Sequence, residues 1–319
     1  MTSWLRGGQL VGMSGRPSIA DGGPGGDGGR SGKGLPEGAG RVAESPEPPV
    51  VVIAPSPRWR ALELSEIWRF RDLLFFLVWR DVKVRYKQTV LGVLWVALRP
   101  LLSVAAYSVV FGRLARMPSE GLPYPIFVFA AMLPWSFFST SVSVGTMSLA
   151  GNAHLISKVY FPRLIIPIAS TLATFVDVGI SFGAIVALMA FYGSAPAASS
   201  FLLIPALFAL VACISLGASL WLGALNVRYR DVGNAVPFLL QIGMYATPVV
   251  YPLGLVPERY RNLVVLNPLT GVVEGFRAAL FGKTLPATPL VVSGVLGLTL
   301  LVSGLYFFQS AERTFADTV

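Results

Sequence analysis

The residues that could support catalysis are few and widely spaced in this sequence. It contains one histidine, His154, and one cysteine, Cys213. Cys213 stands inside an apolar run, where a small buried packing residue is expected. His154 has Asn152 and Lys158 nearby but no neighbouring carboxylate or second histidine, so it offers neither a base–nucleophile pair nor a metal site. The sequence therefore predicts no catalytic residues and no metal site.

A glycine–lysine pair at positions 32 and 33 is the nearest approach to a nucleotide-binding loop. The motif fails on both sides of this pair, because position 27 is Asp where the first glycine belongs and position 34 is Gly where Ser or Thr would reach magnesium. No cofactor is therefore expected in this chain. Residues 1–57, which contain the pair, hold fourteen glycines and eight prolines. Such a composition predicts a disordered Gly/Pro-rich tail.

Two ionisable residues stand inside long apolar runs, where an unpaired charge is costly. Asp177 lies near the middle of the run 165–192, and Arg99 lies eight residues into the run 91–112. The two residues would form an intramembrane pair if their helices touch; alternatively, Arg99 extends to the inner interface. A proton relay needs a chain of such groups across the membrane, and the other runs offer essentially none. This argues against proton-coupled transport.

The composition of the whole chain identifies the elements that carry these residues. Of 319 residues, 54% are hydrophobic and only 13% are charged, against about 25% charged in soluble domains. Each apolar run is long enough to cross a hydrocarbon core of about 30 Å as a helix. The sequence predicts an all-α polytopic membrane protein whose residues 91–319 form six transmembrane helices. The runs are 91–112, 124–147, 165–192, 201–226, 235–253 and 289–308. The fifth run is the shortest and contains Gln241, Thr247 and Pro248.

Two segments outside these runs have amphipathic helical patterns. Within residues 58–90, an apolar stripe of Ile67, Phe70, Leu74 and Leu77 is separate from most of the charged residues, which predicts a helix in the membrane interface. The second helix is expected just after Asn267-Pro268, lying in the outer interface or re-entering from it. Its apolar stripe faces away from Glu274 and Arg277 and consists of Leu269, Val272, Val273, Phe276 and Leu280.

The positions of the basic residues predict the orientation. With the N-terminus inside, residues 58–90, the inside connections and the segment after the last span carry thirteen Lys and Arg residues, and the outside connections carry six. Both termini are therefore expected in the cytoplasm. The net charge of +9 is explained by this bias and by anionic lipid headgroups, so no nucleic-acid partner is predicted.

Aromatic residues and glycines in the runs suggest further roles. Aromatic faces could stack on sugar rings in a channel, although an interfacial belt together with core packing is the simpler explanation. The aromatic residues proposed for this channel are Tyr107, Phe111, Trp135, Phe138, Tyr245 and Tyr251. Gly179 and Gly183 form a small-xxx-small pair, which predicts close packing of the third helix against another.

Several motifs in order resemble the permease subunits of bacterial ABC-type polysaccharide exporters, which serve O-antigen, teichoic acid and capsule. The resemblance covers about residues 64–319, so residues 1–57 depart from the family pattern. The motifs include residues 80–88 running into Leu91-Gly92, then Trp95, Arg99-Pro100, residues 158–163, residues 226–231, Pro248, Asn267-Pro268 and residues 312–317.

The resemblance implies a six-span subunit in the bacterial inner membrane that forms a homodimer and pairs with two copies of a cytoplasmic ABC ATPase, which binds ATP and Mg²⁺. It implies that the connection between the second and third spans is a coupling helix on the ATPase, with Asn152, His154, Lys158 and Arg163 at the contact. It also implies that residues 58–90 form a gate helix and that the helix after Asn267-Pro268 is part of an outer gate.

The cargo implied by the family is a glycan on a polyprenyl-diphosphate lipid. Its diphosphate needs cationic donors at the inner interface. Arg80, Lys83, Arg85 and Lys87 stand at this place, although plain anchoring to lipid headgroups explains them as well. The runner-up is a drug or lipid exporter of the same superfamily. An intramembrane transferase should show a cluster of His, Asp or Glu at one membrane face, and a channel should show carboxylate rings or filter loops; the sequence has neither.

Overall fold

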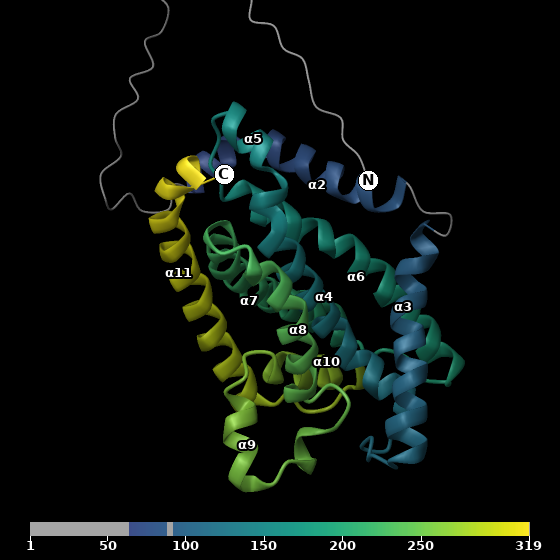
Figure 1. The fold of residues 1–319 in the computed structure, drawn as a ribbon. Coiled ribbons are helices and arrows are strands. Elements are labelled where there is room, and N and C mark those ends of the chain that lie inside the picture. Colours follow the sequence, from purple (N-terminus) through teal and green to yellow (C-terminus); the bar gives the residue numbers. More distant parts are fainter. Residues whose placement is uncertain (1–63, 88–91, 319) are drawn as a thin grey trace, which may run out of the picture. The chain divides into compact units, whose positions relative to one another are not determined.

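The computed structural model describes residues 64–87 and 92–318, which form helices joined by turns and loops (Figure 1). No strand occurs within these ranges, which confirms the predicted all-α class. The tail predicted over residues 1–57 and both ends of the 58–90 segment lie outside the described residues.

Among the described residues, five helices are long and apolar enough to cross a membrane, and they match five of the six predicted runs. The first, Leu94–Leu114, joins α3 (Gly92–Tyr107) to a π-helical end, η1 (Ser108–Leu114). The others are α4 (Tyr124–Gly151), α6 (Ile165–Phe191), α7 (Ser200–Arg228) and α11 (Ala287–Thr318).

The run predicted as a span over 235–253 has different bounds and a different form. Its helix, α8 (Asp231–Ala246), has 16 residues, or about 24 Å of helix against a hydrocarbon core of about 30 Å. Residues 247–252 then continue without regular helix. The prediction was therefore wrong over these residues, because the helix begins earlier and ends at Ala246.

A bent helical pair follows the short 3-10 turn η2 (Leu253–Leu255). Helices α9 (Glu258–Val265) and α10 (Thr270–Phe281) meet at 95°. The break contains Asn267, whose amide oxygen accepts from the Leu269 N–H (3.0 Å) and whose amide nitrogen donates to Thr247 Oγ1 (2.8 Å). The pair forms either a broken sixth span or a re-entrant loop. Helix α10 is buried against α4, α7 and α11. Of the two predicted placements, a helix lying in the outer interface is therefore wrong for α10.

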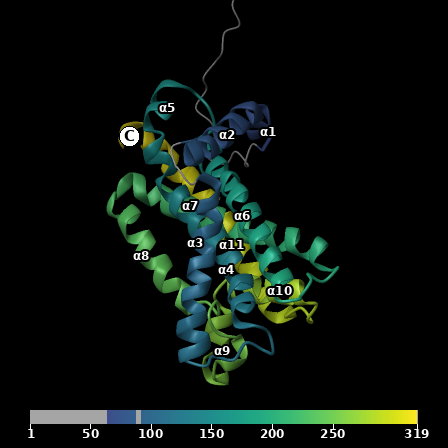
Figure 2. The ribbon, with the colours of Figure 1, turned by 90° about the vertical axis from the view of Figure 1, so that its right-hand side faces the viewer.

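The predicted amphipathic helix exists as α1 (Leu64–Arg69) and α2 (Arg71–Lys87), with α2 packed along α6. Its predicted apolar stripe is confirmed, since Leu77 is fully buried and Ile67, Phe70 and Leu74 pack beside it. Helix α2 shares one end of the bundle with α5 (Ala153–Lys158), while α9 lies at the opposite end (Figure 2).

Glycines allow close helix packing in the bundle, but not the glycines that the pattern indicated. A Cβ atom on Gly217 of α7 would come within 2.7 Å of the Leu300 backbone in α11. By contrast, a Cβ on Gly179 or Gly183 would meet no atom within 4 Å. Both of these glycines are exposed on α6, so the packing predicted for them is absent from the described part of the protomer.

Candidate functional site

An ion pair joins the C-terminal part of α2 to the middle of α6. Arg85 Nη1 donates to Asp177 Oδ2 at 2.5 Å, and Tyr86 Oη donates to Asp177 Oδ1 at 2.5 Å. The Arg85 and Asp177 side chains are 23% and 21% exposed. Arg99 is exposed on α3. The predicted Arg99–Asp177 pair is therefore wrong: α2, not α3, supplies the cation.

Tyr86 acts as a neutral donor in this contact. Its partial burial, together with the hydrogen bond to Asp177 and the charge of that carboxylate, raises the pKa of the Tyr86 phenol above its ordinary value. The phenol therefore keeps its proton at neutral pH. With two donors on one carboxylate, both Asp177 oxygens bind α2 to α6.

The four basic residues proposed to bind a lipid diphosphate fall into two sets. Arg80 Nη2 lies 2.8 Å from Asp81 Oδ1, and Arg85 is paired with Asp177. Lys83 and Lys87 are exposed, and residues two positions from Asp81 or Arg85 on a helix point about 200° away from them. The two lysines therefore lie on the outer face of α2, and the two arginines are held in ion pairs.

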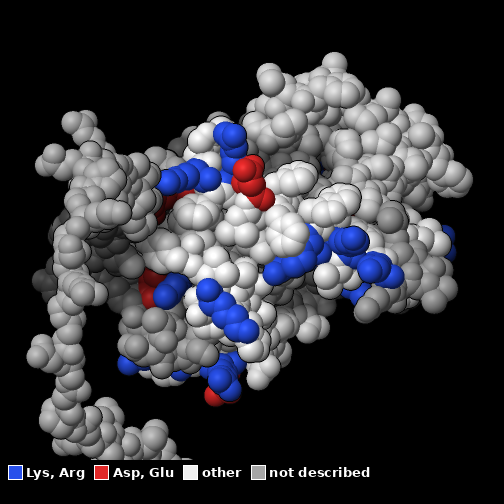
Figure 3. Space-filling view, turned by 90° about the horizontal axis from the view of Figure 1, so that it is seen from above, with Lys and Arg blue, Asp and Glu red and all other residues white. Residues whose placement is uncertain are grey.

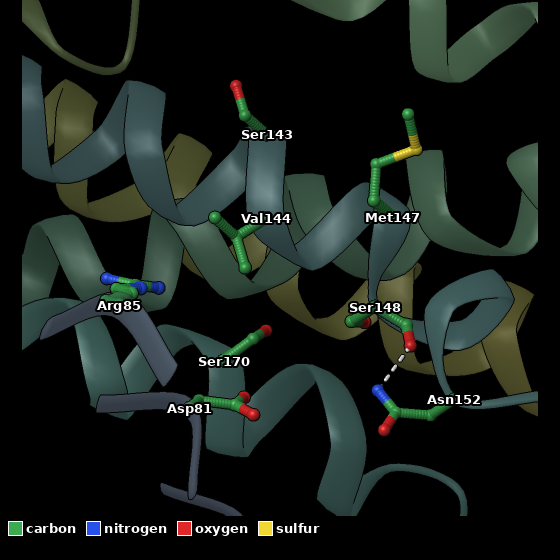
Figure 4. Close-up of a pocket in the computed structure, with 8 residues that line it drawn as sticks. All are labelled: Asp81, Arg85, Ser143, Val144, Met147, Ser148, Asn152 and Ser170. Carbon is green, nitrogen blue, oxygen red and sulfur yellow. Dashed lines mark hydrogen bonds between the residues drawn. The ribbon is translucent and has the colours of Figure 1, made fainter. Parts of the chain in front are cut away.

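A cavity of about 390 Å³ lies between α2, α4 and α6. Asp81 and Arg85 line it from α2, Ser170 from α6, and the remaining residues from α4 and its C-terminal end (Figure 4). These are Ser143, Val144, Met147, Ser148 and Asn152. The sequence analysis considered charge and missed these hydroxyls and this amide, although Ser139 and Ser143 stand four residues apart in an apolar run, which is a usable signal.

The aromatic residues proposed for a channel gather where α3, α4 and α8 meet. The rings of Tyr107 and Phe111 lie 6.1 Å apart, and those of Trp135 and Phe138 lie 5.7 Å apart. Tyr107 also contacts Met244 of α8 through its hydroxyl (3.5 Å). The other two members are linked to each other, because Tyr251 Oη donates to the Tyr245 carbonyl (3.2 Å).

A second cavity, of about 360 Å³, lies between α4 and α8 beside these aromatic residues. Its polar groups are the indole of Trp135, the hydroxyls of Ser139, Thr140 and Ser143, and the amide of Gln241. Val144, Pro237, Leu240 and Met244 complete its lining. Ser143 and Val144 line the first cavity too, so the two cavities adjoin along α4.

A buried arginine holds the non-helical segment after α8. The Arg277 side chain is only 3% exposed and pairs with Glu274 at 2.9 Å. It also donates to the Val249 carbonyl at 2.7 Å, and its guanidinium lies 3.7 Å from the centre of the Phe127 ring. The sequence pattern set Glu274 and Arg277 on a polar face away from the core. The structure corrects this, because that face of α10 is buried against other elements.

The residues proposed to contact an ATPase differ in exposure. His154 and Lys158 are exposed on α5, whereas the Asn152 amide donates to the Ser148 carbonyl at 2.8 Å. Arg163 is half-buried, and its guanidinium contacts both the main-chain carbonyl and the side-chain carboxylate of Glu312 in α11. Tyr160, with 87% of its surface exposed, was missed; an aromatic residue beside a short polar helix was the available signal.

Comparison with known proteins adds to this geometry. Residues 72–281 match the family described as ABC-2 type transporter. The chain is 31% identical over 260 residues to the Myxococcus xanthus protein named O-antigen export system permease protein RfbA, covering 80% of this chain and 98% of that protein. It is 28% identical over 246 residues to a Klebsiella pneumoniae protein of the same name, with 77% and 94% covered. It is 22% identical over 239 residues to the Escherichia coli polysialic acid transport protein KpsM, with 73% and 91% covered.

Proposed function

Because this chain belongs to the ABC-2 type transporter family, we propose that it is the transmembrane subunit of an ATP-driven exporter of lipid-linked polysaccharide. The observation that carries this proposal is the extent of the likeness to the Myxococcus xanthus permease, which includes 98% of that protein. The family match over residues 72–281 includes most of α2, four of the five long helices of the described residues, and the bent pair α9–α10. The cargo class is therefore taken from a whole permease rather than from one shared element.

The proposed location is the bacterial inner membrane, with the α2 end of the bundle and both termini in the cytoplasm. Figure 3 looks onto this end and shows Lys and Arg side chains spread among uncharged residues of its described surface, with fewer Asp and Glu. The exposed basic residues near α2, α5 and the α7–α8 turn are Arg69, Arg71, Lys83, Lys87, Lys158, Arg228 and Arg230. Such a bias is typical of a cytoplasmic membrane face.

ATP hydrolysis is assigned to a separate ATPase subunit that binds ATP and Mg²⁺, in a complex of two permease and two ATPase copies. Helix α5 suits a contact with this partner, because it projects His154 and Lys158 outward and is followed by exposed Val159 and Tyr160. A short helix with one basic and one aromatic group can insert into a groove of a partner protein. Arg163 serves this contact indirectly, by holding the segment after α5 against α11.

The lipid end of the cargo is proposed to meet α2. Lys83 and Lys87 are exposed ammonium groups on its outer face, and ammonium groups are suitable donors to diphosphate oxygens. The ion pair of Arg85 with Asp177 keeps α2 against α6 at this place. Release or bending of α2 would then open the side of the bundle to a lipid-linked substrate.

Complementation of a strain that lacks this subunit tests the proposal. The full chain should restore polysaccharide to the cell surface, and lipid-linked polysaccharide should accumulate inside cells without it. A matched control is the same strain with the ATPase subunit inactivated, which should accumulate the same intermediate. Normal surface polysaccharide in the strain without the permease would contradict the proposal.

A further inference from the structure

We infer that the cavity between α2, α4 and α6 is a binding site for a neutral sugar residue, and that it opens along α4 into a glycan path that passes Trp135. This inference rests on the proposed function and deepens it, because it assigns the sugar part of the cargo to particular hydroxyl and amide groups. The sugar then lies in this cavity, whereas the diphosphate binds Lys83 and Lys87 on the opposite face of α2.

The first step of the argument is the continuity of the space. Ser143 and Val144 line both cavities, so one turn of α4 forms the boundary between them. Their volumes, about 390 and 360 Å³, each lie in the range of about 300–1,000 Å³ found for small-ligand sites. A chain of sugar residues can therefore occupy both cavities in succession.

The second step is the charge balance of the first cavity. It contains one carboxylate and one guanidinium, Asp81 and Arg85. Each is compensated by its own partner, since Asp81 is paired with Arg80 and Arg85 with Asp177. A phosphate group requires cations that are not already neutralised, and the Asp81 carboxylate would repel it. The cavity therefore favours a neutral polar ligand.

The third step is the supply of hydrogen-bonding groups. Ser148 and Ser170 donate their hydroxyl protons to the Gly145 and Pro167 carbonyls of their own helices (2.7 and 2.9 Å), which leaves their oxygens as acceptors. The Ser143 hydroxyl makes no hydrogen bond with any residue that the structure describes. Sugar hydroxyls both donate and accept, so they match this mixture of groups.

Arg85 supplies a further unmet donor at the same place. Its Nη1 binds Asp177, but its Nη2 is shielded from solvent and has no hydrogen-bond partner among the described residues. A buried donor without a partner costs about 1–3 kcal/mol. A small movement of α2 that brings a ligand oxygen to Nη2 would remove this cost, so ligand binding and the position of α2 are coupled.

The fourth step is the change of chemistry along α4. The second cavity adds the indole of Trp135 and the amide of Gln241 to the hydroxyls of Ser139 and Thr140. An aromatic surface suits the apolar C–H face of a sugar ring, while hydroxyl and amide groups suit its edge. None of the residues that line this second cavity is charged. A polymer is therefore held by weak contacts and can slide.

A cysteine-protection experiment on the assembled exporter tests the sugar site. Cys213 is the single native cysteine, so a Cys213→Ala background allows one cysteine to be placed at Ser143. The control is Ser310→Cys, which is exposed on α11 and lines neither cavity. The complex is labelled with a soluble maleimide, with or without oligosaccharide released by mild acid from the host's own polysaccharide, and separately with inorganic pyrophosphate.

The oligosaccharide should slow labelling of Ser143→Cys by about threefold at twice its dissociation constant, since protection follows 1 + [L]/Kd. It should leave Ser310→Cys unchanged, and pyrophosphate should protect neither. Protection of Ser143→Cys by pyrophosphate alone would make the cavity a phosphate site and overturn the inference. Lack of protection by the oligosaccharide, or no labelling of Ser143→Cys in the complex, would also overturn it.

Export in cells separates this inference from the proposed function. Ser143→Trp fills the boundary between the cavities and should reduce surface polysaccharide to the level of the strain without the permease, at normal membrane abundance. The matched control is Ser310→Trp, at an exposed position of α11 that lines neither cavity, and it should export near the wild-type level. If the wild-type chain fails to restore export, the proposed function fails. If wild type and Ser143→Trp restore export equally, only the sugar path fails.

Discussion

Arg85 and Asp177 are 92 positions apart in the sequence, yet their side chains meet at 2.5 Å and join α2 to the middle of α6. Tyr86 binds the second oxygen of the same carboxylate. The contact is partly buried, so its strength exceeds that of an exposed surface pair. It gives α2 a defined resting position against the bundle, which the gate role proposed for this helix requires.

The first prediction concerns this pair. Asp177→Ala leaves Arg85 half-buried without its carboxylate, and Arg85→Ala leaves Asp177 with Tyr86 alone. Each single variant should lower the thermal unfolding midpoint of the detergent-solubilised protein. The double variant should lose less than the sum of the two, with a coupling of about 0.5–3 kcal/mol. Arg99→Ala is the control, and its effect should add independently to that of Asp177→Ala. Coupling of Arg99, rather than Arg85, to Asp177 would contradict the geometry.

The second prediction compares two ion pairs near the α9 end of the bundle. Arg277→Ala removes a 3% exposed guanidinium and leaves Glu274 and the Val249 carbonyl without their donor. We expect a loss of about 3–5 kcal/mol in the free energy of unfolding, seen as a large fall in thermal midpoint and in membrane abundance.

Lys283→Ala is the matched control for that comparison. Its pair with Glu120 has the same kind of charges at 2.7 Å, but the side chains are 37% and 39% exposed. The expected loss is about 0–1 kcal/mol. Equal losses for Arg277→Ala and Lys283→Ala would show that burial of the first pair does not govern its contribution.

The third prediction concerns the surface of α5. Tyr160→Ala and Lys158→Glu change exposed side chains that make no hydrogen bond or ion pair with any described residue, so the permease should keep its abundance. Both variants should recover less ATPase subunit in co-purification from membranes. Arg163→Ala should act differently and lower the stability of the permease itself, because Arg163 binds Glu312 of α11. Normal ATPase recovery with Tyr160→Ala and Lys158→Glu together would remove α5 from the proposed contact.

The fourth prediction separates two kinds of glycine. Gly217→Ala places a Cβ within 2.7 Å of the Leu300 backbone, which forces α7 and α11 apart at a cost of about 1–3 kcal/mol. Gly183→Ala meets open space and should be neutral or raise stability by about 0.5–1 kcal/mol through better helix propensity. Thermal midpoints of the two purified variants measure the difference. A destabilising Gly183→Ala would indicate that a partner subunit packs on α6.

The sequence by itself determined the helical membrane class and the positions of most elements. Runs of about 20 apolar residues can satisfy their backbone groups in lipid as helices, so α4, α6 and α7 could be placed from composition. The stripe through Leu77 was equally readable, because helical periodicity puts those side chains on one face. The predicted span over 235–253 failed at Thr247 and Pro248, since residues there bind α10 and the break after α9 instead of continuing α8.

The tertiary structure alone decided which distant residues meet. A lone Asp177 in an apolar run predicts that a partner exists, but the identity of Arg85 depends on how α2 rotates and lies along α6. Arg277 looked like a polar-face residue because periodicity describes one helix and not its neighbours. The cavity that brings Ser143 of α4 near Asp81 of α2 exists only after three helices pack. Contacts of this kind are set by side-chain shape across helix interfaces, which a linear pattern does not contain.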